Sequence, residues 1–204
     1  PLNLVYTCLC MGAGITIAQG LHRIEPDAYT LAFIGDSTLF ASGITGIITA
    51  VYNQTDIVLV ILDNSTTAMT GQQPPPGTGH TMMGCISEKV SIEKILKAIG
   101  IKAIYKSNPF DLKSAESAAI AAAESPGVSA VIYEAPCIAV SKPSEPYAVD
   151  SSKCIGCKKC ISEIGCPSIS MNGKLAVIDE LTCYGCGICA QLCPTGAINV
   201  RGNK

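Results

Sequence analysis

The sequence has few cationic residues and no long apolar segment. Only two of its 204 residues are arginine, and 14 lysines and arginines stand against 16 acidic residues, which gives a net charge of −2. Nucleic acids and acidic membrane surfaces are recognised by clustered positive charge, so we expect neither as a partner. The most apolar stretch, residues 44–62, is interrupted by polar residues at 53–56, whereas a membrane-spanning helix needs about 18 apolar residues in succession. We therefore expect a soluble protein.

The first residues also lack the basic and apolar regions of a secretory signal. Twelve residues are cysteine, and eight of these fall between Cys154 and Cys193 in a regular pattern. Disulfide-rich secreted domains are small, whereas clustered cysteines behind a long apolar segment are typical of metal binding in a reducing compartment. We therefore expect a cytoplasmic, metal-binding protein. Because the chain begins with Pro1 rather than methionine, we expect it to be a fragment or a processed product.

The first 140 residues alternate between short apolar stretches and helical patterns, which is typical of a mostly parallel α/β sheet. The expected strands span residues 29–34, 57–62, 101–106 and 129–133, and the expected helices lie near residues 13–24, 39–53, 91–99 and 111–124. Residues 141–149 contain two prolines and two serines without apolar periodicity, which indicates a linker. We therefore expect an α/β domain over residues 1–140 and a small α+β domain over residues 150–204.

The second domain contains an internal repeat rich in cysteine. DSSKCIGCKKC, which begins at Asp150, is matched by DELTCYGCGIC, which begins at Asp179, and each half closes on Cys-Pro. This pattern resembles bacterial ferredoxins with two 4Fe-4S clusters, in which the last cysteine of each half ligates the other cluster. The resemblance implies one cluster on Cys154, Cys157, Cys160 and Cys193, and a second on Cys183, Cys186, Cys189 and Cys166.

The first half of the repeat departs from the usual ferredoxin spacing. Five residues separate Cys160 from Cys166, whereas three separate Cys189 from Cys193, so we expect the chain to wrap differently around one cluster. Glycines between the cysteines, at positions 156, 185 and 187, are expected to let backbone N–H groups approach the cluster sulfides. A pair of zinc sites is the alternative, although zinc usually takes its four ligands in two pairs.

Four further cysteines fit no ligand spacing. They are Cys8, Cys10, Cys85 and Cys137. Free cysteine most often behaves as a small apolar residue, so the spacing alone predicts buried thiols at these positions.

Two polar segments follow neighbouring expected strands. GDST, residues 35–38, follows the first strand, and DNSTT, residues 63–67, follows the second. Ligands of open α/β sheets bind beyond the carboxyl ends of the strands, so we expect Asp36 and Asn64 to lie close together. Their side-chain oxygens and the carbonyl of Thr66 would supply half of an octahedral magnesium shell and leave the rest for phosphate and water. An ordinary turn is the alternative for Asn64 alone, since Asp and Asn favour turns.

The 27 residues between Asp36 and Asn64 give these segments the spacing of a cofactor motif. They resemble the thiamine diphosphate motif, commonly GDG followed by NN, from which Ser37 and Asp63 depart. CMGAG at residues 10–14, TTAMTGQQPPPGTG at residues 66–79 and the cysteine repeat resemble the large subunit of indolepyruvate:ferredoxin oxidoreductases, with glutamine in place of histidine at position 72. The resemblance implies that thiamine diphosphate and Mg²⁺ are bound by Cys10, Met11, Gly12, Gly35, Asp36, Ser37, Asn64, Thr66, Met69 and Thr70.

The same resemblance implies an enzyme that oxidatively decarboxylates 2-oxo acids, including arylpyruvates such as indolepyruvate, to acyl-CoA. Thiamine diphosphate would supply the decarboxylation chemistry, coenzyme A would accept the acyl group, and 4Fe-4S clusters would carry electrons to ferredoxin. In this family a glutamate on a separate domain activates the cofactor, and Glu25 and Glu88 lack a matching context. We therefore expect turnover to need a missing N-terminal region and a second, beta subunit.

Other functions fit parts of the pattern. The chain could be an electron-transfer or cofactor-binding module without independent catalysis, or part of another 2-oxoacid:ferredoxin oxidoreductase. A non-oxidative thiamine decarboxylase fits less well, because it has no use for eight cluster ligands. No catalytic side chain is identified by the sequence.

Overall fold

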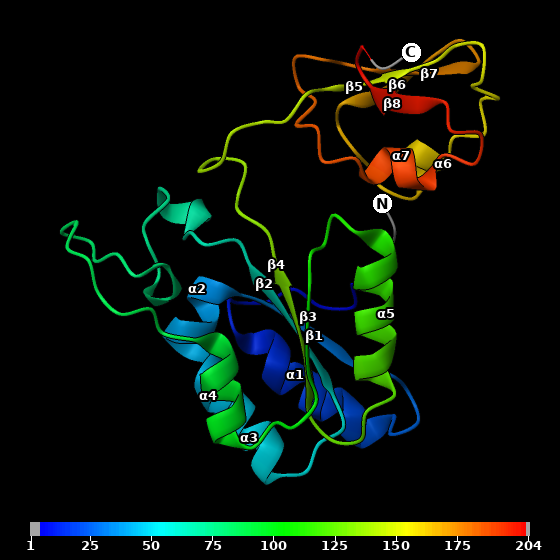
Figure 1. Ribbon diagram of the computed structural model, residues 1–204. Coiled ribbons are helices and arrows are strands. Elements are labelled where there is room, and N and C mark those ends of the chain that lie inside the picture. The colour runs from blue at the N-terminus through cyan, green and yellow to red at the C-terminus, as the bar shows by residue number, and fades with distance from the viewer. Residues whose placement is uncertain (1–4, 203–204) are drawn as a thin grey trace. The chain divides into compact units, whose positions relative to one another are not determined.

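The computed structural model describes residues 5–202 (Figure 1). Contacts within the chain divide it between Val140 and Ser141 into two compact units, and each unit has its own hydrophobic core. No helix among the described residues combines the length and apolar character that crossing a membrane requires.

The N-terminal unit is built on a four-stranded parallel sheet (Figure 1). Its strands are β1 (Leu31–Gly35), β2 (Val58–Asp63), β3 (Ile104–Ser107) and β4 (Ser129–Glu134), in the spatial order β1-β2-β4-β3. The two central strands are apolar on both faces, as expected of parallel strands with helices on either side. Their register places Gly35 beside Leu62 and Asp63 beside Glu134, so the polar residues after these strands gather at one edge.

Helices cover both faces of this sheet. On one face lie α1 (Ala13–Ile24), α3 (Ile44–Tyr52) and α4 (Ile92–Ile99), and Ile15, Ile47 and Leu96 from these helices are fully buried in its core. On the other face lies α5 (Leu112–Ala123), where Ala122 packs with Val60 and Val131. Successive strand residues point to opposite faces, so each central strand contributes to both cores. The predicted α/β class is confirmed.

The helix after β1 begins earlier than the sequence predicts. It runs without a break through α2 (Asp36–Thr38), the π-helical turn η1 (Leu39–Gly43) and α3, whereas the apolar pattern begins at residue 39. The polar residue at 36 conceals this start, because Asp36 is buried in the helix rather than solvated in a turn. The loop after β2 holds two short 3-10 turns, η2 (Ala68–Thr70) and η3 (Pro76–Thr78).

The third strand also differs from the prediction, since it begins at Ile104 rather than Ile101. Gly100 adopts a left-handed φ of 109° at the end of α4, and Ile101 donates its backbone N–H to the Leu96 carbonyl. Ile101 is buried there. Its apolar side chain therefore belongs to the helix-ending motif, in which the residue after a left-handed glycine packs back on the last turn.

The C-terminal unit is small and mixed (Figure 1). It contains α6 (Lys159–Ser162), α7 (Ile188–Leu192) and two antiparallel pairs: β5 (Tyr147–Val149) with β8 (Ile198–Val200), and β6 (Ile169–Asn172) with β7 (Leu175–Ile178). The predicted ferredoxin-like class is confirmed. Residues 147–149, expected in the linker, form β5, because each pairs with a residue of β8.

Candidate cofactor-binding and metal sites

The first candidate site lies where β1 and β2 end. Asp36 follows β1 directly and is only 4% exposed, and the backbone N–H of Ser37 donates to its Oδ1 at 2.7 Å. Asp63 ends the neighbouring strand. Parallel strands end at the same edge of a sheet, which is where ligands of this architecture bind, so the two carboxyl groups share that edge.

The environment of Asp36 disfavours its negative charge. Burial raises the pKa of this carboxyl group to about 6; the Ser37 N–H opposes the rise, and the nearby Asp63 carboxylate adds to it. The sequence pattern gave Asp63 no role, and its effect became apparent only from this proximity. A bound divalent cation would offset both burial and repulsion, so the carboxylates fit a magnesium site.

The loop after β2 folds back on its own side chains. Ser65 has a left-handed φ of 59° and donates its N–H to Asp63 Oδ1 at 3.1 Å, and Thr66 donates its N–H to Asn64 Oδ1 at 3.1 Å. Asp and Asn favour such local turns, so the turn interpretation of this pair is correct as local geometry. An amide oxygen has two lone pairs, and Asn64 Oδ1 therefore keeps one for a metal ion.

One buried hydroxyl in this loop points to a ligand, and one backbone hydrogen bond anchors the loop. Thr66 is buried, and its hydroxyl oxygen has no hydrogen-bond partner among the described residues. The Asn64 carbonyl accepts the Cys137 N–H at 3.0 Å, which ties the loop to the chain after β4. A buried polar atom without a partner is unfavourable unless a ligand or water satisfies it.

A hydrogen bond between two side-chain hydroxyls helps to join the two strand-end segments, and the sequence pattern did not reveal it. The hydroxyl oxygens of Ser37 and Thr67 lie 2.8 Å apart. Thr67 also donates its N–H to the Gln73 carbonyl at 2.8 Å, which closes the short loop that carries Met69 and Thr70. Met69 is 84% exposed, so its side chain is open to contact from outside the chain.

The N-terminal segment reaches the same edge through Gly12. This glycine has a left-handed φ of 91°, and a Cβ atom there would lie 2.5 Å from the Ser42 hydroxyl oxygen and 3.8 Å from Thr38 Cγ2. The segment thus packs on the helix that begins at Asp36. Cys10 and Met11, immediately before it, are exposed.

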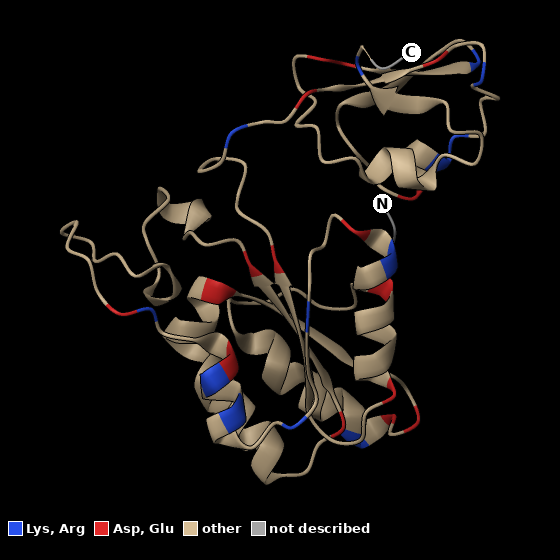
Figure 2. Cartoon of the chain, in the orientation of Figure 1, with Lys and Arg blue, Asp and Glu red and all other residues tan. Residues whose placement is uncertain are grey.

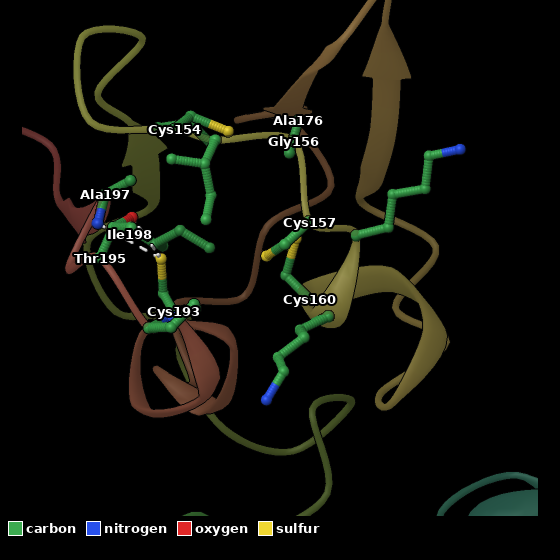
Figure 3. Close-up of a pocket in the computed structure, with 14 residues that line it drawn as sticks. Cys154, Gly156, Cys157, Cys160, Ala176, Cys193, Thr195, Ala197 and Ile198 are labelled. Carbon is green, nitrogen blue, oxygen red and sulfur yellow. Dashed lines mark hydrogen bonds between the residues drawn. The ribbon is translucent and has the colours of Figure 1, made fainter.

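The second candidate site is a cavity in the C-terminal unit, shown in Figure 3. Its lining includes Cys154, Cys157 and Cys160 from the first half of the repeat and Cys193 from the second. Burial would raise the pKa of Cys193, but hydrogen bonds from Thr195 and from the N–H groups of Ala197 and Ile198 together lower it. The Ala197 N–H lies 3.3 Å from the sulfur. The four thiols expected to share a cluster are therefore brought together.

The remaining four cluster cysteines also interact with one another. The pKa of Cys189 is raised to about 11, chiefly by burial and then by charge repulsion from Cys186, Cys183 and Cys166. Thiolates repel one another without a metal, and metal binding displaces their protons. Among residues 5–202, no three His, Cys, Asp or Glu side chains converge on a single-ion position. Four neighbouring cysteine thiols fit a 4Fe-4S cluster, in which each thiolate would bind one iron atom.

The glycines between these cysteines serve chain packing. At Gly156, with φ of 68°, an added Cβ would clash with the Lys174 carbonyl, and at Gly185, with φ of 78°, it would lie 2.7 Å from the Glu145 carbonyl. Close approach of a backbone is a common reason for glycine. Here the groups that approach the glycines are backbone carbonyls of the protein itself. The sequence did not indicate these contacts.

The expectation of buried thiols outside the repeat is wrong for three of the four cysteines. Cys8, Cys10 and Cys85 are exposed, and Cys137 is half-buried. They lie in irregular segments before α1, before α4 and after β4, where no apolar core covers them.

Together the two units define a thiamine diphosphate-type α/β domain followed by a ferredoxin-like domain. The model of the family described as thiamine pyrophosphate enzyme, C-terminal TPP binding domain, matches residues 2–132, and that of the 4Fe-4S binding domain matches residues 176–199. The chain therefore belongs to the thiamine pyrophosphate enzymes.

Curated relatives confirm the predicted resemblance to indolepyruvate oxidoreductases. Indolepyruvate oxidoreductase subunit IorA of Archaeoglobus fulgidus is 42% identical over 137 residues, which are 67% of this chain and 22% of that protein. The IorA subunit of Thermococcus kodakarensis is 37% identical over 150 residues, 67% of this chain and 23% of that protein. The chain thus spans less than a quarter of the length of these relatives.

A solved structure has the same fold. The 2-oxoglutarate:ferredoxin oxidoreductase of Magnetococcus marinus, with 2-oxoglutarate, coenzyme A and succinyl-CoA bound, aligns with a TM-score of 0.58 at 18% identity. The alignment covers 64% of this chain and 47% of that one.

Proposed function

We propose that this chain is the cofactor-binding and electron-transfer part of a cytoplasmic 2-oxoacid:ferredoxin oxidoreductase. Its reaction is the oxidative decarboxylation of arylpyruvates such as indolepyruvate to acyl-CoA. The observation that carries the proposal is the presence, in one chain, of a strand-end site with a buried carboxylate and of two cysteine quartets. The names of the curated relatives support the substrate class.

The strand-end site would hold Mg²⁺ and the diphosphate of thiamine diphosphate. Asp36, Asn64 and the Thr66 carbonyl supply oxygen ligands of the kind that magnesium prefers. Ser37 and Thr67 hold the two loops together by their hydrogen bond, and Gly12 lets the N-terminal segment approach the helix after Asp36. When bound, thiamine diphosphate supplies the carbanion-stabilising chemistry of 2-oxo acid decarboxylation.

The cysteine quartets would hold two 4Fe-4S clusters with crossed ligation. Cys193, which lines the cavity of the first quartet, would ligate the cluster of the first half, and Cys166, which lies near Cys189, would ligate that of the second. Clusters exchange single electrons, whereas oxidation of a 2-oxo acid to an acyl group releases two. Two clusters in one chain can therefore store the pair before it leaves, one electron at a time, for ferredoxin.

We propose that turnover requires more than this chain. The chain spans 22% of the length of the A. fulgidus relative, and neither Glu25 nor Glu88 has the sequence context of an activating glutamate. The remaining N-terminal region and a second, beta subunit would complete the active site and bind coenzyme A and the 2-oxo acid.

Two measurements on anaerobically reconstituted protein test the proposal. Iron and sulfide analysis should give about eight iron atoms per chain, as two 4Fe-4S clusters require. Calorimetry should detect thiamine diphosphate binding that depends on Mg²⁺, in the chain or in its complex with the remaining parts. Stoichiometric zinc with negligible iron, or cofactor binding unaffected by chelation of Mg²⁺, would refute the corresponding half of the proposal.

A further inference from the structure

The two halves of the cysteine repeat differ in charge. Lys158 and Lys159 line the cavity of the first quartet, whereas glycine and isoleucine occupy the corresponding positions, 187 and 188, of the second half. The carbonyl of Lys174 lies against Gly156 in the first cysteine loop. Lys158 and Lys159 thus bring positive charge to the cavity of Cys154, Cys157 and Cys160, and the backbone of Lys174 lies against the same loop.

Among residues 5–202, no ion pair involves these lysines. All three are exposed, and Figure 2 shows cationic residues beside α6. In the part of the chain that the structure describes, the ion pairs are Lys97–Glu93, Lys106–Glu134, Lys153–Asp150 and Arg201–Glu180. None of these pairs involves Lys158, Lys159 or Lys174, so their charge is available to a partner.

The second cysteine loop is covered in part by its own chain, although its Cys186 is exposed. We call residues 141–147 the strap. Ser144 of the strap donates its N–H to the Tyr184 carbonyl at 3.1 Å, and the Tyr184 hydroxyl donates to the Lys142 carbonyl at 3.1 Å and bonds to the Ser141 hydroxyl. Gly187 is buried, with the Tyr147 hydroxyl 2.8 Å from where its Cβ would lie. The strap therefore covers Tyr184 and Gly187, the positions that correspond to Ile155 and Lys158 of the first loop.

The equivalent position in the first loop is apolar and open. Ile155 occupies the place of Tyr184 in the repeat and is 68% exposed, whereas Tyr184 is half-buried under the strap. An apolar centre with a charged rim is the usual composition of a transient protein interface, in which the charges increase the association rate.

We infer that the surface formed by Ile155, Lys158, Lys159 and Lys174 is the electron-exchange face of the protein, and that it docks a small acidic iron–sulfur protein. The inference rests on the proposed function, because it requires that the two clusters are bound. In the step itself, one electron leaves the reduced cluster on Cys154, Cys157, Cys160 and Cys193 and reduces the oxidised iron–sulfur centre of the partner. No bond forms or breaks, and no proton moves.

The test uses reduced clusters and therefore does not depend on 2-oxo acid chemistry. The chain of residues 1–204 with reconstituted clusters is reduced with dithionite, freed of excess reductant, and mixed by anaerobic stopped flow with an acidic two-cluster ferredoxin. The variant Lys158→Gln/Lys159→Gln/Lys174→Gln is compared with a control of equal charge change, Lys94→Gln/Lys102→Gln/Lys113→Gln, whose lysines are exposed on the other unit. EPR of both reduced proteins checks that the two clusters are retained.

We expect the second-order rate constant of the surface variant to fall about tenfold or more at low ionic strength, because charge steering accelerates association by such factors. The control should match the unmodified protein, and added salt should reduce the difference, because salt screens exposed charges. Single lysine variants are measured as well, in case the triple variant loses clusters. Equal rates for surface variant and control overturn the docking face. Absence of clusters from the unmodified protein overturns the proposed function instead.

Discussion

Ser37 and Thr67 lie 30 positions apart in the sequence, and their hydroxyl oxygens are 2.8 Å apart. This hydrogen bond joins the segment after β1, which carries Asp36, to the segment after β2, which carries Asn64 and Thr66. Because β1 and β2 are parallel neighbours, their ends already lie at one edge. The hydrogen bond fixes the two loops at that edge.

Removing this hydrogen bond should weaken cofactor binding more than it weakens folding. Ser37→Ala and Thr67→Val should each lower the affinity for thiamine diphosphate and Mg²⁺ by roughly three- to tenfold, since one net hydrogen bond contributes about 0.5–1.5 kcal/mol. Calorimetry on the two variants and the double variant forms a double-mutant cycle. Strictly additive losses would show that the two hydroxyls do not act together.

The effect of Asp36→Asn on the melting temperature should depend on whether the cofactor is present. The substitution keeps the shape of the side chain but removes a buried charge that lies near Asp63, so the cofactor-free protein should melt at the same temperature or higher. Addition of Mg²⁺ and thiamine diphosphate should raise the melting temperature of the unmodified protein only, because ligand binding stabilises the native state. Equal stabilisation of the variant would mean that Asp36 is not a magnesium ligand.

Gly187 and Lys158 occupy equivalent positions in the repeat, and both have left-handed backbones, with φ of 75° and 64°. Gly187→Ala should destabilise the cluster-loaded unit, because a left-handed alanine costs about 1–2 kcal/mol and its Cβ would lie 2.8 Å from the Tyr147 hydroxyl. Lys158→Ala is the matched control and should be nearly neutral, since neither side chain favours this conformation. Chemical denaturation under anaerobic conditions compares them, and equal losses would contradict the packing argument.

The sequence predicts the sheet and the grouping of the eight cysteines in the second unit, because both depend on patterns of residue type; their assignment as cluster ligands stays a prediction. Apolar runs mark β1 to β4, and the cysteine spacing indicates which thiols gather. Contacts made across the fold are not predictable in this way: neither the repulsion between Asp36 and Asp63 nor the strap on Tyr184 leaves a local signal. The prediction of a strand at Ile101 was wrong because a helix-ending contact and a strand both favour an apolar residue at such a position.

Crossed ligation predicts which cluster each single cysteine affects. Cys166→Ser should damage the cluster held by Cys183, Cys186 and Cys189, whereas Cys193→Ser should damage the one held by Cys154, Cys157 and Cys160. Mössbauer and EPR spectra of the two reconstituted variants should therefore retain different clusters. Loss of the same cluster in both variants would contradict the crossing.

We propose that electrons from a 2-oxo acid, released at the strand-end site, reach the clusters of the same chain. The most direct measurement is anaerobic EPR of the reconstituted complex, containing this chain, the remaining N-terminal region and the second subunit, after addition of indolepyruvate and coenzyme A. Reduced 4Fe-4S signals should appear in the unmodified complex but not in Asp36→Asn, while dithionite should reduce the clusters of both. Substrate-driven reduction that is undiminished in Asp36→Asn, or absent from the unmodified complex, would refute electron transfer from the strand-end site to the clusters.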